Sequence, residues 1–300
     1  MTREQTSQKA YAKINIGLDV LRRRSDGYHE VRMIMQTVDL CDDLLFEKTQ
    51  QPGIVLKTNN DELPVNGDNL ICKAAALLFR ERGIKEGVKI TLTKRIPIAA
   101  GMAGGSSDAA ATMRGLNELF DMGYSTRELQ ALGVTLGADI PYCLVGGTML
   151  SEGIGEILTP LPAPPACHLV VAKPDINVST GFVYGNLHAD TLTEHPDIEG
   201  MIEALKTGSL QGITDRLGNV LETVTVKEYP MIEELKELLR SKGAENALMS
   251  GSGPTVFGIF VNREAAEKAA SAIKEQGLAG QIYVTGFCNT EDRSCGQRER

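Results

Sequence analysis

The chain lacks the long apolar segments and the paired cysteines that mark several classes of protein. It has no run of eighteen apolar residues, so we expect no membrane-spanning helix. The first ten residues, MTREQTSQKA, contain no apolar core, so we expect no secretory signal. None of its cysteines stands in a C-x-x-C pair, which argues against a zinc site. Together these features favour the reducing cytoplasm.

Basic residues are also in deficit, with 31 Lys and Arg against 39 Asp and Glu and a net charge of -8. Nucleic acid polymers are bound by positive surfaces, so this balance argues against a long nucleic acid as partner. A single nucleotide is not excluded, because it needs only one loop rich in hydrogen-bond donors. A length of 300 residues allows two domains with cores large enough to fold without a metal or disulfide.

Alternating polarity predicts the first strands. Apolar residues at every second position predict a half-buried strand over 14–20. Asp26-Gly27 predicts a hairpin turn, with the returning strand over 28–40. Two further short strands are expected over 43–48 and 53–58.

Capping residues predict the helices that follow. We expect Asp68 to cap a helix that ends at Gly83, and a strand over 88–95 to lead into a glycine-rich stretch. A helix from Ser107 to Phe120 should follow, with a buried face at 109, 113, 116 and 120. Ser125 and Glu128 predict a capping box for the next helix, which Gly137 should end. Gly146-Gly147 predicts a turn between two strands.

The proline-rich run over 160–165 predicts a domain boundary, which divides the chain into residues 1–160 and 161–300. In the second part we expect strands over 168–173, 246–250, 255–261 and 281–287, and helices over 230–241 and 263–276. This order is typical of a ferredoxin-like split βαβ unit in an α+β protein. The polar tail over 290–300 is expected to be disordered.

The strongest chemical signal is the segment PIAAGMAGGSSDAAATM, residues 97–113. Glycines allow a tight turn and close approach to a ligand, and the helix start offers free N–H groups and a positive dipole end. The combination predicts an anion site suited to a triphosphate, although neither a Walker A nor a Rossmann pattern is present. The alternative is a flexible turn in which Asp108 serves only as a helix cap. We expect Ala100 and Ala103 to keep negative φ.

Three segments together resemble the motifs of the GHMP kinases: AKINIGLDV at 12–20, the glycine-rich segment at 97–113, and SGSGPTVFGIF at 250–260. DGYHEV at 26–31 and GADIPYCL at 137–144 are similar to the members of this family that act on a cytidine diphosphate-linked polyol. The resemblance implies an N-terminal ribosomal-protein-S5-like α/β domain and a C-terminal ferredoxin-like domain. It also implies ATP and Mg²⁺, with a 2-hydroxyl as acceptor.

The resemblance assigns roles to individual residues. Lys13 and Asp139 match the catalytic pair, with Asp139 either accepting the hydroxyl proton or orienting the hydroxyl. The ATP-binding positions are Pro97, Ala99, Ala100, Gly101, Met102, Ala103, Gly104, Gly105, Ser106 and Ser107. The substrate-binding positions are Asn15, Tyr28, His29, Tyr184, Gly251 and Ser252, with Phe182 as a rival to Tyr184. Protein ligands of the metal stay unknown.

Two other functions remain open at this stage. One is a GHMP kinase that acts on homoserine, mevalonate or a sugar, against which the aromatic positions Tyr28 and Tyr184 argue, because those substrates have no base to stack on. The other is a nucleotide-binding regulator without catalysis, against which the presence of both Lys13 and Asp139 argues. The oligomeric state, monomer or homodimer, is open as well.

Overall fold

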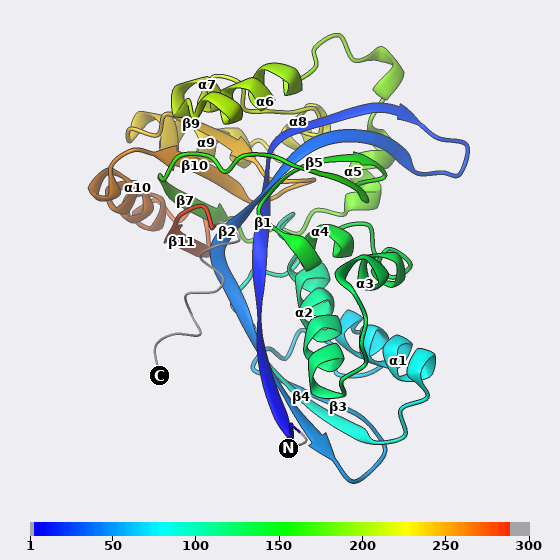
Figure 1. Cartoon of the computed structure of the whole chain (residues 1–300). Helices are drawn as coiled ribbons and strands as arrows, with labels where there is room; N and C mark the ends of the chain where they lie inside the picture. The colour runs from blue at the N-terminus through cyan, green and yellow to red at the C-terminus, as the bar shows by residue number, and fades with distance from the viewer. Residues whose placement is uncertain (1–2, 289–300) are drawn as a thin grey trace. The chain divides into compact units, whose positions relative to one another are not determined.

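The computed structural model describes residues 3–288, and the chain forms two compact units (Figure 1). Unit 1 consists of residues 3–12, 40–98 and 103–145, and unit 2 of residues 13–39, 99–102 and 146–288. The first two strands, β1 (Gln5–Arg23) and β2 (His29–Thr49), contribute residues to both units. The division at residue 160 stays a prediction, and the tail over 290–300 lies outside the described residues.

The second strand is longer than its sequence pattern indicated. The predicted strands over 28–40 and 43–48 are one strand, β2, so the predicted break between them was wrong. The reason is Asp42, whose side chain is buried in unit 1 but satisfied, because its Oδ1 accepts the backbone N–H groups of Arg95 (2.5 Å) and Ile96 (2.8 Å). A satisfied carboxylate is tolerated inside a strand where an unpaired one is not.

Unit 1 combines a small sheet with four helices. The parallel pair β3 (Gly53–Thr58) and β4 (Gly87–Thr93) continues antiparallel to the part of β2 from residue 43 to 49. The helices are α1 (Leu70–Arg82), α2 (Gly104–Leu119), α3 (Thr126–Gly133) and α4 (Ile140–Val145). Helix α2 packs against both α1 and α4, and α3 packs against α4. Helix α2 is therefore central to this unit.

The core of unit 1 forms around α2. Its predicted buried face is confirmed at Ala109, Met113 and Leu116, but not at Phe120, which is the C-cap of the helix and only half-buried. Gly115 lies against the ring of the fully buried Phe46, and a Cβ at Gly115 would stand 2.5 Å from Phe46 Cε2. Glycine is required there because the helix and the aromatic ring approach too closely for a methyl group.

The observed ends of α1 and α3 differ from two predictions and confirm one. The N-cap of α1 is Asn69, not Asp68, because Asn69 Oδ1 accepts the N–H of Ile71 at 2.9 Å. The capping box of Ser125 and Glu128 is confirmed. Helix α3 ends at Gly133, not at Gly137, because the chain turns after Gly133.

Two further boundaries differ from expectation. Helix α2 begins at Gly104, three residues before the predicted start at Ser107, so Asp108 lies inside the helix and is not its cap. Gly146-Gly147 connects α4 to β5 (Thr148–Gly153), so the predicted turn between two strands was wrong. The short helix α4 is one of the elements that sequence patterns missed.

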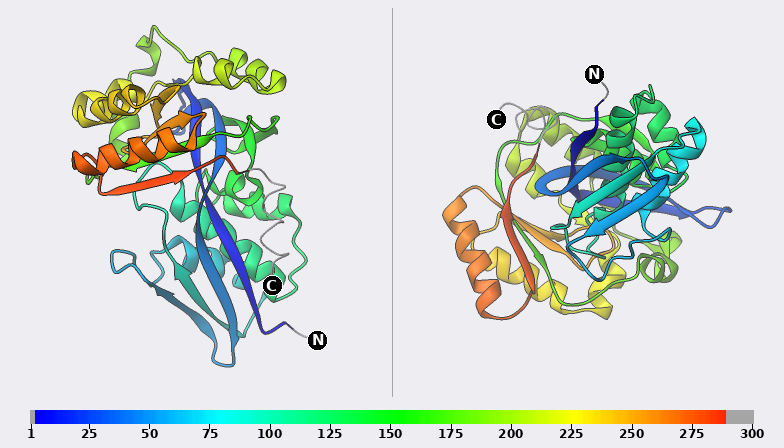
Figure 2. Two further views of the ribbon diagram at one scale, coloured as in Figure 1. Left: turned by 90° about the vertical axis from the view of Figure 1, so that its left-hand side faces the viewer. Right: turned by 90° about the horizontal axis from the view of Figure 1, so that it is seen from below.

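Unit 2 holds a four-stranded antiparallel sheet with the strand order β11-β7-β10-β9. These strands are β7 (His168–Lys173), β9 (Asn246–Met249), β10 (Val256–Phe260) and β11 (Gln281–Thr285). The helices α9 (Met231–Ser241) and α10 (Arg263–Glu275) pack against this sheet and against each other. Both views of Figure 2 show α10 (orange) beside β11 (red). The predicted ferredoxin-like βα-ββ-αβ order is confirmed.

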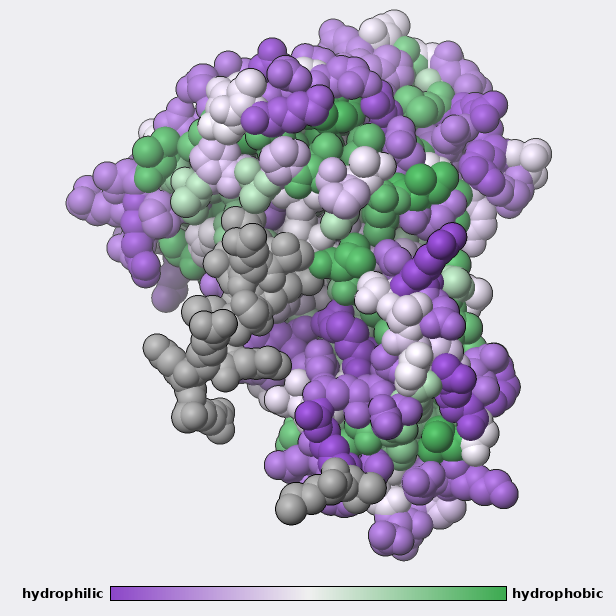
Figure 3. Space-filling view, in the orientation of Figure 1, coloured by the Kyte–Doolittle hydropathy of each residue, from purple (hydrophilic) through white to green (hydrophobic). Residues whose placement is uncertain are grey.

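The remaining elements of unit 2 are short. β5 pairs with β2 and with β6 (Ile157–Pro160), and β8 (Gly218–Asn219) pairs in parallel with β1. The helices are α5 (Thr180–Asn186), α6 (Ile198–Thr207), α7 (Leu210–Thr214), α8 (Glu222–Glu228) and the 3₁₀ turn Ala189–Thr191. The outer face of α10 carries charged side chains and is purple in Figure 3. Among residues 3–288, no helix has the length and apolarity needed to cross a bilayer.

Candidate active site

The glycine-rich loop is held in unit 2 by backbone contacts. Gly101 has a φ of 68°, and a Cβ there would lie 2.2 Å from the carbonyl oxygen of Ser250. Gly101 in turn accepts a hydrogen bond from Ser250 Oγ at 3.0 Å. The carbonyl of Met102 accepts the N–H of Lys13 at 3.1 Å. The loop is thus fixed between β1 and the segment after β9, with glycine required by the close approach at residue 101.

The backbone conformation of Ala103, where the glycine-rich loop enters α2, differs from the predicted one. Ala103 has a φ of 55°, so the predicted negative φ was wrong for Ala103, whereas Ala100 keeps a negative φ. An L-residue in the left-handed region costs about 1–2 kcal/mol. Ala103 supplies no side-chain cap, and its carbonyl accepts the N–H of Ser107 at 2.8 Å. The first N–H groups of α2 therefore have no side-chain acceptor at the N-cap, as an anion site requires.

The first turn of α2 carries the predicted phosphate-binding residues Gly104, Gly105, Ser106 and Ser107. Ser107 is buried, and its Oγ donates to the carbonyl of Tyr11 at 2.6 Å, which ties α2 to the start of β1 in unit 1. Ser106 is half-buried. Of the two serine hydroxyls, Ser106 is the better placed to contact a ligand, because the proton of Ser107 is already donated within the protein.

A buried ionic cluster lies beneath this first turn. Lys94 Nζ is 2.6 Å from Asp42 Oδ2 and 2.8 Å from Asp108 Oδ2. A Cβ at Gly104 would lie 3.0 Å from the same ammonium nitrogen, so the charge sits close to the helix N-terminus. Burial alone would lower the pKa of Lys94, but the attraction of Asp108 and Asp42 outweighs it and raises the pKa. Lys94 is therefore charged at neutral pH.

Lys13 is buried in β1 of unit 2. Its Nζ donates to Asn15 Oδ1 at 2.8 Å, and Asn15 Nδ2 is 3.2 Å from the sulfur of Met33. Asn15 is completely buried. The two side chains share one face of the strand, as alternation predicted, and Asn15 orients the ammonium group. Residues 14–20 are buried on both faces, so the predicted half-burial of this strand was wrong.

Asp139 lies in unit 1 in the turn that precedes α4, and its carbonyl accepts the N–H of Cys143 at 3.0 Å. Asp139 is half-buried. The same turn approaches the start of α2, because a Cβ at Gly137 would lie 3.8 Å from Ser106 Oγ. The turn that contains the predicted acidic catalyst therefore lies beside a predicted phosphate-binding serine within this unit.

The second glycine loop, Ser250–Gly253, is tied to several parts of unit 2. A Cβ at Gly251 would lie 3.0 Å from the carbonyl oxygen of Gly101, so the two glycine loops touch through their backbones. Asn219 Nδ2 donates to the carbonyls of Met249 (2.9 Å) and Gly251 (2.8 Å). The hydroxyls of Ser252 and Thr180 are 2.9 Å apart. This loop supports the first one, which a simple hairpin turn would not do.

Aromatic residues from two distant segments meet in unit 2. The rings of His29 and Tyr184 have their centroids 5.1 Å apart with an interplanar angle of 43°. Burial, and the nearby positive charge of Arg23, lower the pKa of His29 below its usual range. The imidazole is therefore neutral at pH 7. Tyr28 and Phe182 are 58% and 42% exposed, so both rings are open to a ligand.

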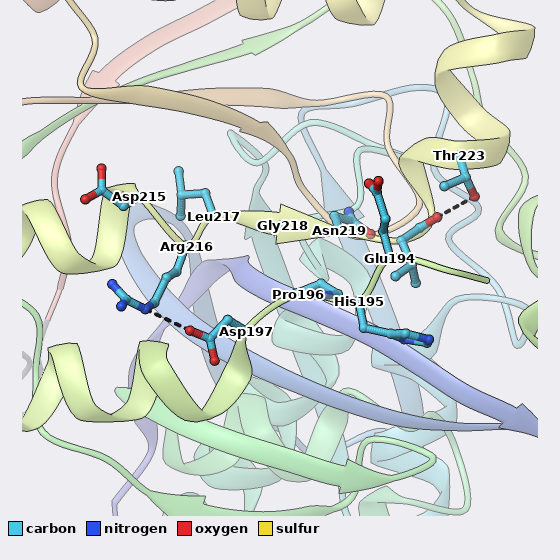
Figure 4. A pocket seen from close by; sticks show the side chains of 11 residues that line it. Glu194, His195, Pro196, Asp197, Asp215, Arg216, Leu217, Gly218, Asn219 and Thr223 are labelled. Carbon is cyan, nitrogen blue, oxygen red and sulfur yellow. Dashed lines mark hydrogen bonds and ion pairs between the residues drawn. The ribbon is translucent and has the colours of Figure 1, made fainter.

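A cavity of about 580 Å³ opens in unit 2 beside the second glycine loop (Figure 4). Asn219 lines it while holding Gly251, and Arg216 lines it while pairing with Asp197 at 3.0 Å. His195 at its wall contacts the buried Asp19 through Nδ1 at 2.8 Å. Sequence patterns predicted none of these lining residues as functional.

Two family models match the chain. The GHMP kinases N terminal domain matches residues 69–147, which include the glycine-rich loop and Asp139. The GHMP kinases C terminal domain matches residues 201–279, which include the second glycine loop.

Relatives match nearly the whole chain. A protein of Lachnoclostridium phytofermentans named 4-diphosphocytidyl-2-C-methyl-D-erythritol kinase is 52% identical over 95% of this chain and 98% of its own length. The protein of that name from Lachnospira eligens is 49% identical over 94% and 98%. The chain belongs to this family of GHMP kinases. A solved 4-(cytidine 5'-diphospho)-2C-methyl-D-erythritol kinase matches with a TM-score of 0.81 and 34% identity over 94% of this chain and 99% of that one.

More distant kinases are similar to this chain in fold only. A mevalonate kinase of L. major has a TM-score of 0.76 at 17% identity, over 96% of this chain and 98% of that one. The α+β architecture expected from the GHMP kinase motifs is thereby confirmed. The roles of individual residues in this kinase stay predictions, as does the pairing of Lys13 with Asp139, which lie in different units.

Four supporting residues of this kinase escaped the sequence patterns. They are Lys94, Thr180, Asn219 and Ser250, which contact the predicted site residues or lie beneath the first turn of α2. One weak signal existed for Lys94. Asp42 and Asp43 are consecutive acidic residues after an apolar strand, a pattern that indicates a nearby cationic partner. The partners of Thr180 and Asn219 lie 72 and 32 residues away, beyond the reach of periodicity.

Proposed function

We propose that this protein transfers the γ-phosphoryl group of ATP to the 2-hydroxyl of 4-diphosphocytidyl-2-C-methyl-D-erythritol in the non-mevalonate isoprenoid pathway, in the cytoplasm, where ATP is available. The observation that carries the proposal is the position of the two catalytic candidates. Within unit 2, the N–H of Lys13 binds the glycine-rich loop at Met102. Within unit 1, the Asp139 turn neighbours Ser106 at the start of α2. The names of relatives at about half identity support the substrate.

Phosphoryl transfer proceeds through a loose transition state, so positioning and charge stabilisation supply most of the catalysis. In our proposal the first N–H groups of α2 and the hydroxyl of Ser106 hold the phosphates. Lys13, oriented by Asn15, stabilises the charge that develops on the transferred group. Asp139 receives the proton of the acceptor hydroxyl or orients that hydroxyl.

We propose that Mg²⁺ accompanies ATP and neutralises charge on its phosphate oxygens. Among residues 3–288, no group of three or more His, Cys, Asp or Glu side chains forms a metal-binding cluster. In our proposal Ser106 and Asp139 are the candidate oxygen ligands, because Mg²⁺ prefers hard oxygen ligands.

The contact between His29 and Tyr184 supports a cytidine-binding role. An aromatic face stacks on a base, and a neutral imidazole can either donate to or accept from the base edge. Tyr28 is exposed in the adjacent hairpin and adds a second face. Substrates such as homoserine or mevalonate carry no base that would use these rings.

The test is coupled release of ADP with ATP and Mg²⁺, comparing the diphosphocytidyl substrate with methylerythritol phosphate, which lacks the cytidyl group. We expect turnover only with the cytidyl compound. Tyr184→Ala should remove one stacking contact and so raise the substrate KM. The expected loss of binding free energy is about 1–3 kcal/mol. The KM for ATP should stay unchanged. Phe182→Ala is the comparison variant, because a rise of the substrate KM in Phe182→Ala and not in Tyr184→Ala would assign the stacking contact to Phe182. Equal turnover of both compounds would contradict the cytidine site.

A further inference from the structure

Residues 187–197 connect α5 to α6 in unit 2, and we call them the connecting segment. The only regular element in it is the 3₁₀ turn over 189–191, and most of its residues are exposed. Among residues 3–288, its side chains hydrogen-bond outside the segment only through His195 and Asp197. Few polar contacts therefore fix the place of this segment, and α5, which it follows, carries Tyr184.

His195 contacts a buried carboxylate on β1. The side chain of Asp19 is 8% exposed, and its Oδ1 accepts the N–H of Val20 at 2.8 Å. His195 Nδ1 lies 2.8 Å from Oδ1 and 3.0 Å from Oδ2 of Asp19. A carboxylate only accepts hydrogen bonds, so Nδ1 carries the hydrogen. Among residues 3–288, no further group donates to Asp19, so loss of His195 would leave this buried carboxylate with one donor.

The start of α6 lies against the same strands. A Cβ at Gly17 would lie 2.8 Å from Ile198 Cδ1, so the first residue of α6 approaches the backbone of β1 closely. Glu199 Oε1 accepts from Arg32 Nη2 of β2 at 2.5 Å. These two contacts hold α6 itself. The contact of His195 is the one that fastens to β1 the chain that leads back toward α5.

The cavity described above borders the connecting segment. Residues 194–197 form one wall of this space of about 580 Å³, so on that side the segment faces open volume and not a packed core (Figure 4). The ion pair of Asp197 with Arg216 also holds this wall, but these side chains are 58% and 37% exposed. An ion pair that exposed contributes little. The contact of His195 with the buried Asp19 is therefore the principal polar anchor of the segment.

We propose that the contact between His195 and Asp19 positions Tyr184 against His29, so that His195 is a positioning residue for a substrate that carries a cytosine base. The base comes from the proposed function, on which this assignment of substrate class rests. Asp19 and His29 lie on two strands joined by one hairpin, and Tyr184 and His195 lie on either side of one short stretch of chain. The contact of the His29 and Tyr184 rings closes one end of this arrangement, and His195 closes the other. Fastening the segment reduces the conformations open to Tyr184, which preorganises the aromatic site.

The first test compares steady-state kinetics of full-length variants. His195→Ala should raise the KM for the diphosphocytidyl substrate about tenfold, the effect of one lost hydrogen bond to a charged group, and leave kcat and the KM for ATP unchanged. His195→Asn offers an amide N–H to Asp19 and should restore the substrate KM to within about threefold of the wild type. An equal rise of both KM values, or no rescue by asparagine, would overturn the proposal.

His188→Ala is the matched control, because His188 is an exposed histidine of the same segment whose ring makes no hydrogen bond among residues 3–288. It should leave every constant unchanged. Where His195→Ala does not fold, the double variant of Asp19→Ala with His195→Ala takes its place, since it leaves no buried carboxylate without a partner. The double variant should show the same rise of the substrate KM, and a wild-type KM in it would overturn the proposal.

The second test is hydrogen–deuterium exchange of the full-length protein without ligand, followed by mass spectrometry. His195→Ala should speed exchange over residues 180–194 at least about threefold, while His195→Asn and His188→Ala keep the wild-type rates. The four-stranded sheet of unit 2 should exchange as in the wild type. Unchanged rates over 180–194, or faster exchange throughout the protein, would overturn the positioning role. If the wild type phosphorylates neither test compound, the proposed function fails, and the exchange rates still decide whether His195 positions α5.

Discussion

Lys13 shows what a single buried charge implies about a site. Its side chain is almost fully enclosed, and a buried ammonium group is unfavourable unless nearby groups stabilise it. Asn15, itself fully buried, supplies a carbonyl oxygen at 2.8 Å but no negative charge. A hydrogen bond to a neutral amide fixes the position of the ammonium group without cancelling its charge. In our proposal this charge acts on the phosphate groups of the nucleotide.

The first prediction follows for this residue. Lys13→Met keeps the length and volume of the buried side chain and removes its charge. We expect turnover to fall by about 10²–10³, the effect of removing one preorganised donor at a developing charge. The free energy of unfolding should fall by about 1–3 kcal/mol, because the fully buried Asn15 Oδ1 loses the ammonium donor. Steady-state ADP release and urea denaturation measure the two quantities.

Lys9→Met is the matched control, since Lys9 lies on the same strand with an exposed side chain. It should leave turnover unchanged. A comparable loss of turnover in both variants would mean that β1 as a whole, and not the ammonium of Lys13, supports the reaction.

At the scale of elements, sequence patterns found what is periodic and missed what depends on partners. The strand over 14–20, the buried face of α2 and the capping box of Ser125 all follow from local spacing. The continuity of β2 through Asp42 could not be predicted, because the N–H groups that satisfy this carboxylate come from residues 95 and 96. The left-handed φ of Ala103 likewise has no local signal, because alanine rarely adopts this conformation.

The same limit applies to the candidate site. Its glycine loops were visible as motifs, whereas the contact between Gly101 and Gly251 joins residues that are 150 positions apart along the printed sequence. Asn219, which holds Gly251, stands in a strand of only two residues without any repeat to reveal it. Tertiary partners decide such positions, so a single sequence carries no local signal for them.

The fit between α2 and β2 gives a prediction at this scale. Gly115→Ala would place a methyl group 2.5 Å from the buried ring of Phe46, which cannot rotate away in a filled core. We expect the free energy of unfolding to fall by about 1–3 kcal/mol, the usual effect of overpacking. Denaturation by urea, monitored by circular dichroism, measures this change.

Gly185→Ala is the control, because Gly185 also lies in a helix, α5, and a Cβ there would meet no atom within 4 Å. The free energy of unfolding should rise slightly there, since alanine favours helix by about 0.5–1 kcal/mol over glycine. If both variants were stabilised alike, the close approach of Gly115 to Phe46 would not exist in solution.

For the whole molecule, the proposed function requires two nucleotide-like ligands to be bound at once, ATP at α2 and a cytidine diphosphate group at His29 and Tyr184. A net charge of -8 opposes both ligands at long range, so each must be held by local donors. The helix N-terminus supplies them for ATP, and aromatic stacking supplements them for cytidine. No residue belongs to both the proposed ATP site and the proposed cytidine site.

Separate sites predict additive stabilisation. A ligand present at about 100 times its Kd stabilises the folded protein by about 2.7 kcal/mol. Cytidine diphosphate and a non-hydrolysable ATP analogue with Mg²⁺ should therefore together stabilise it by about 5 kcal/mol. Thermal and urea unfolding with each ligand and with both measure the sum, and Tyr184→Ala should remove only the cytidine contribution. If the two ligands together stabilise no more than one alone, they compete for a single nucleotide site, and the assignment of a separate cytidine site fails.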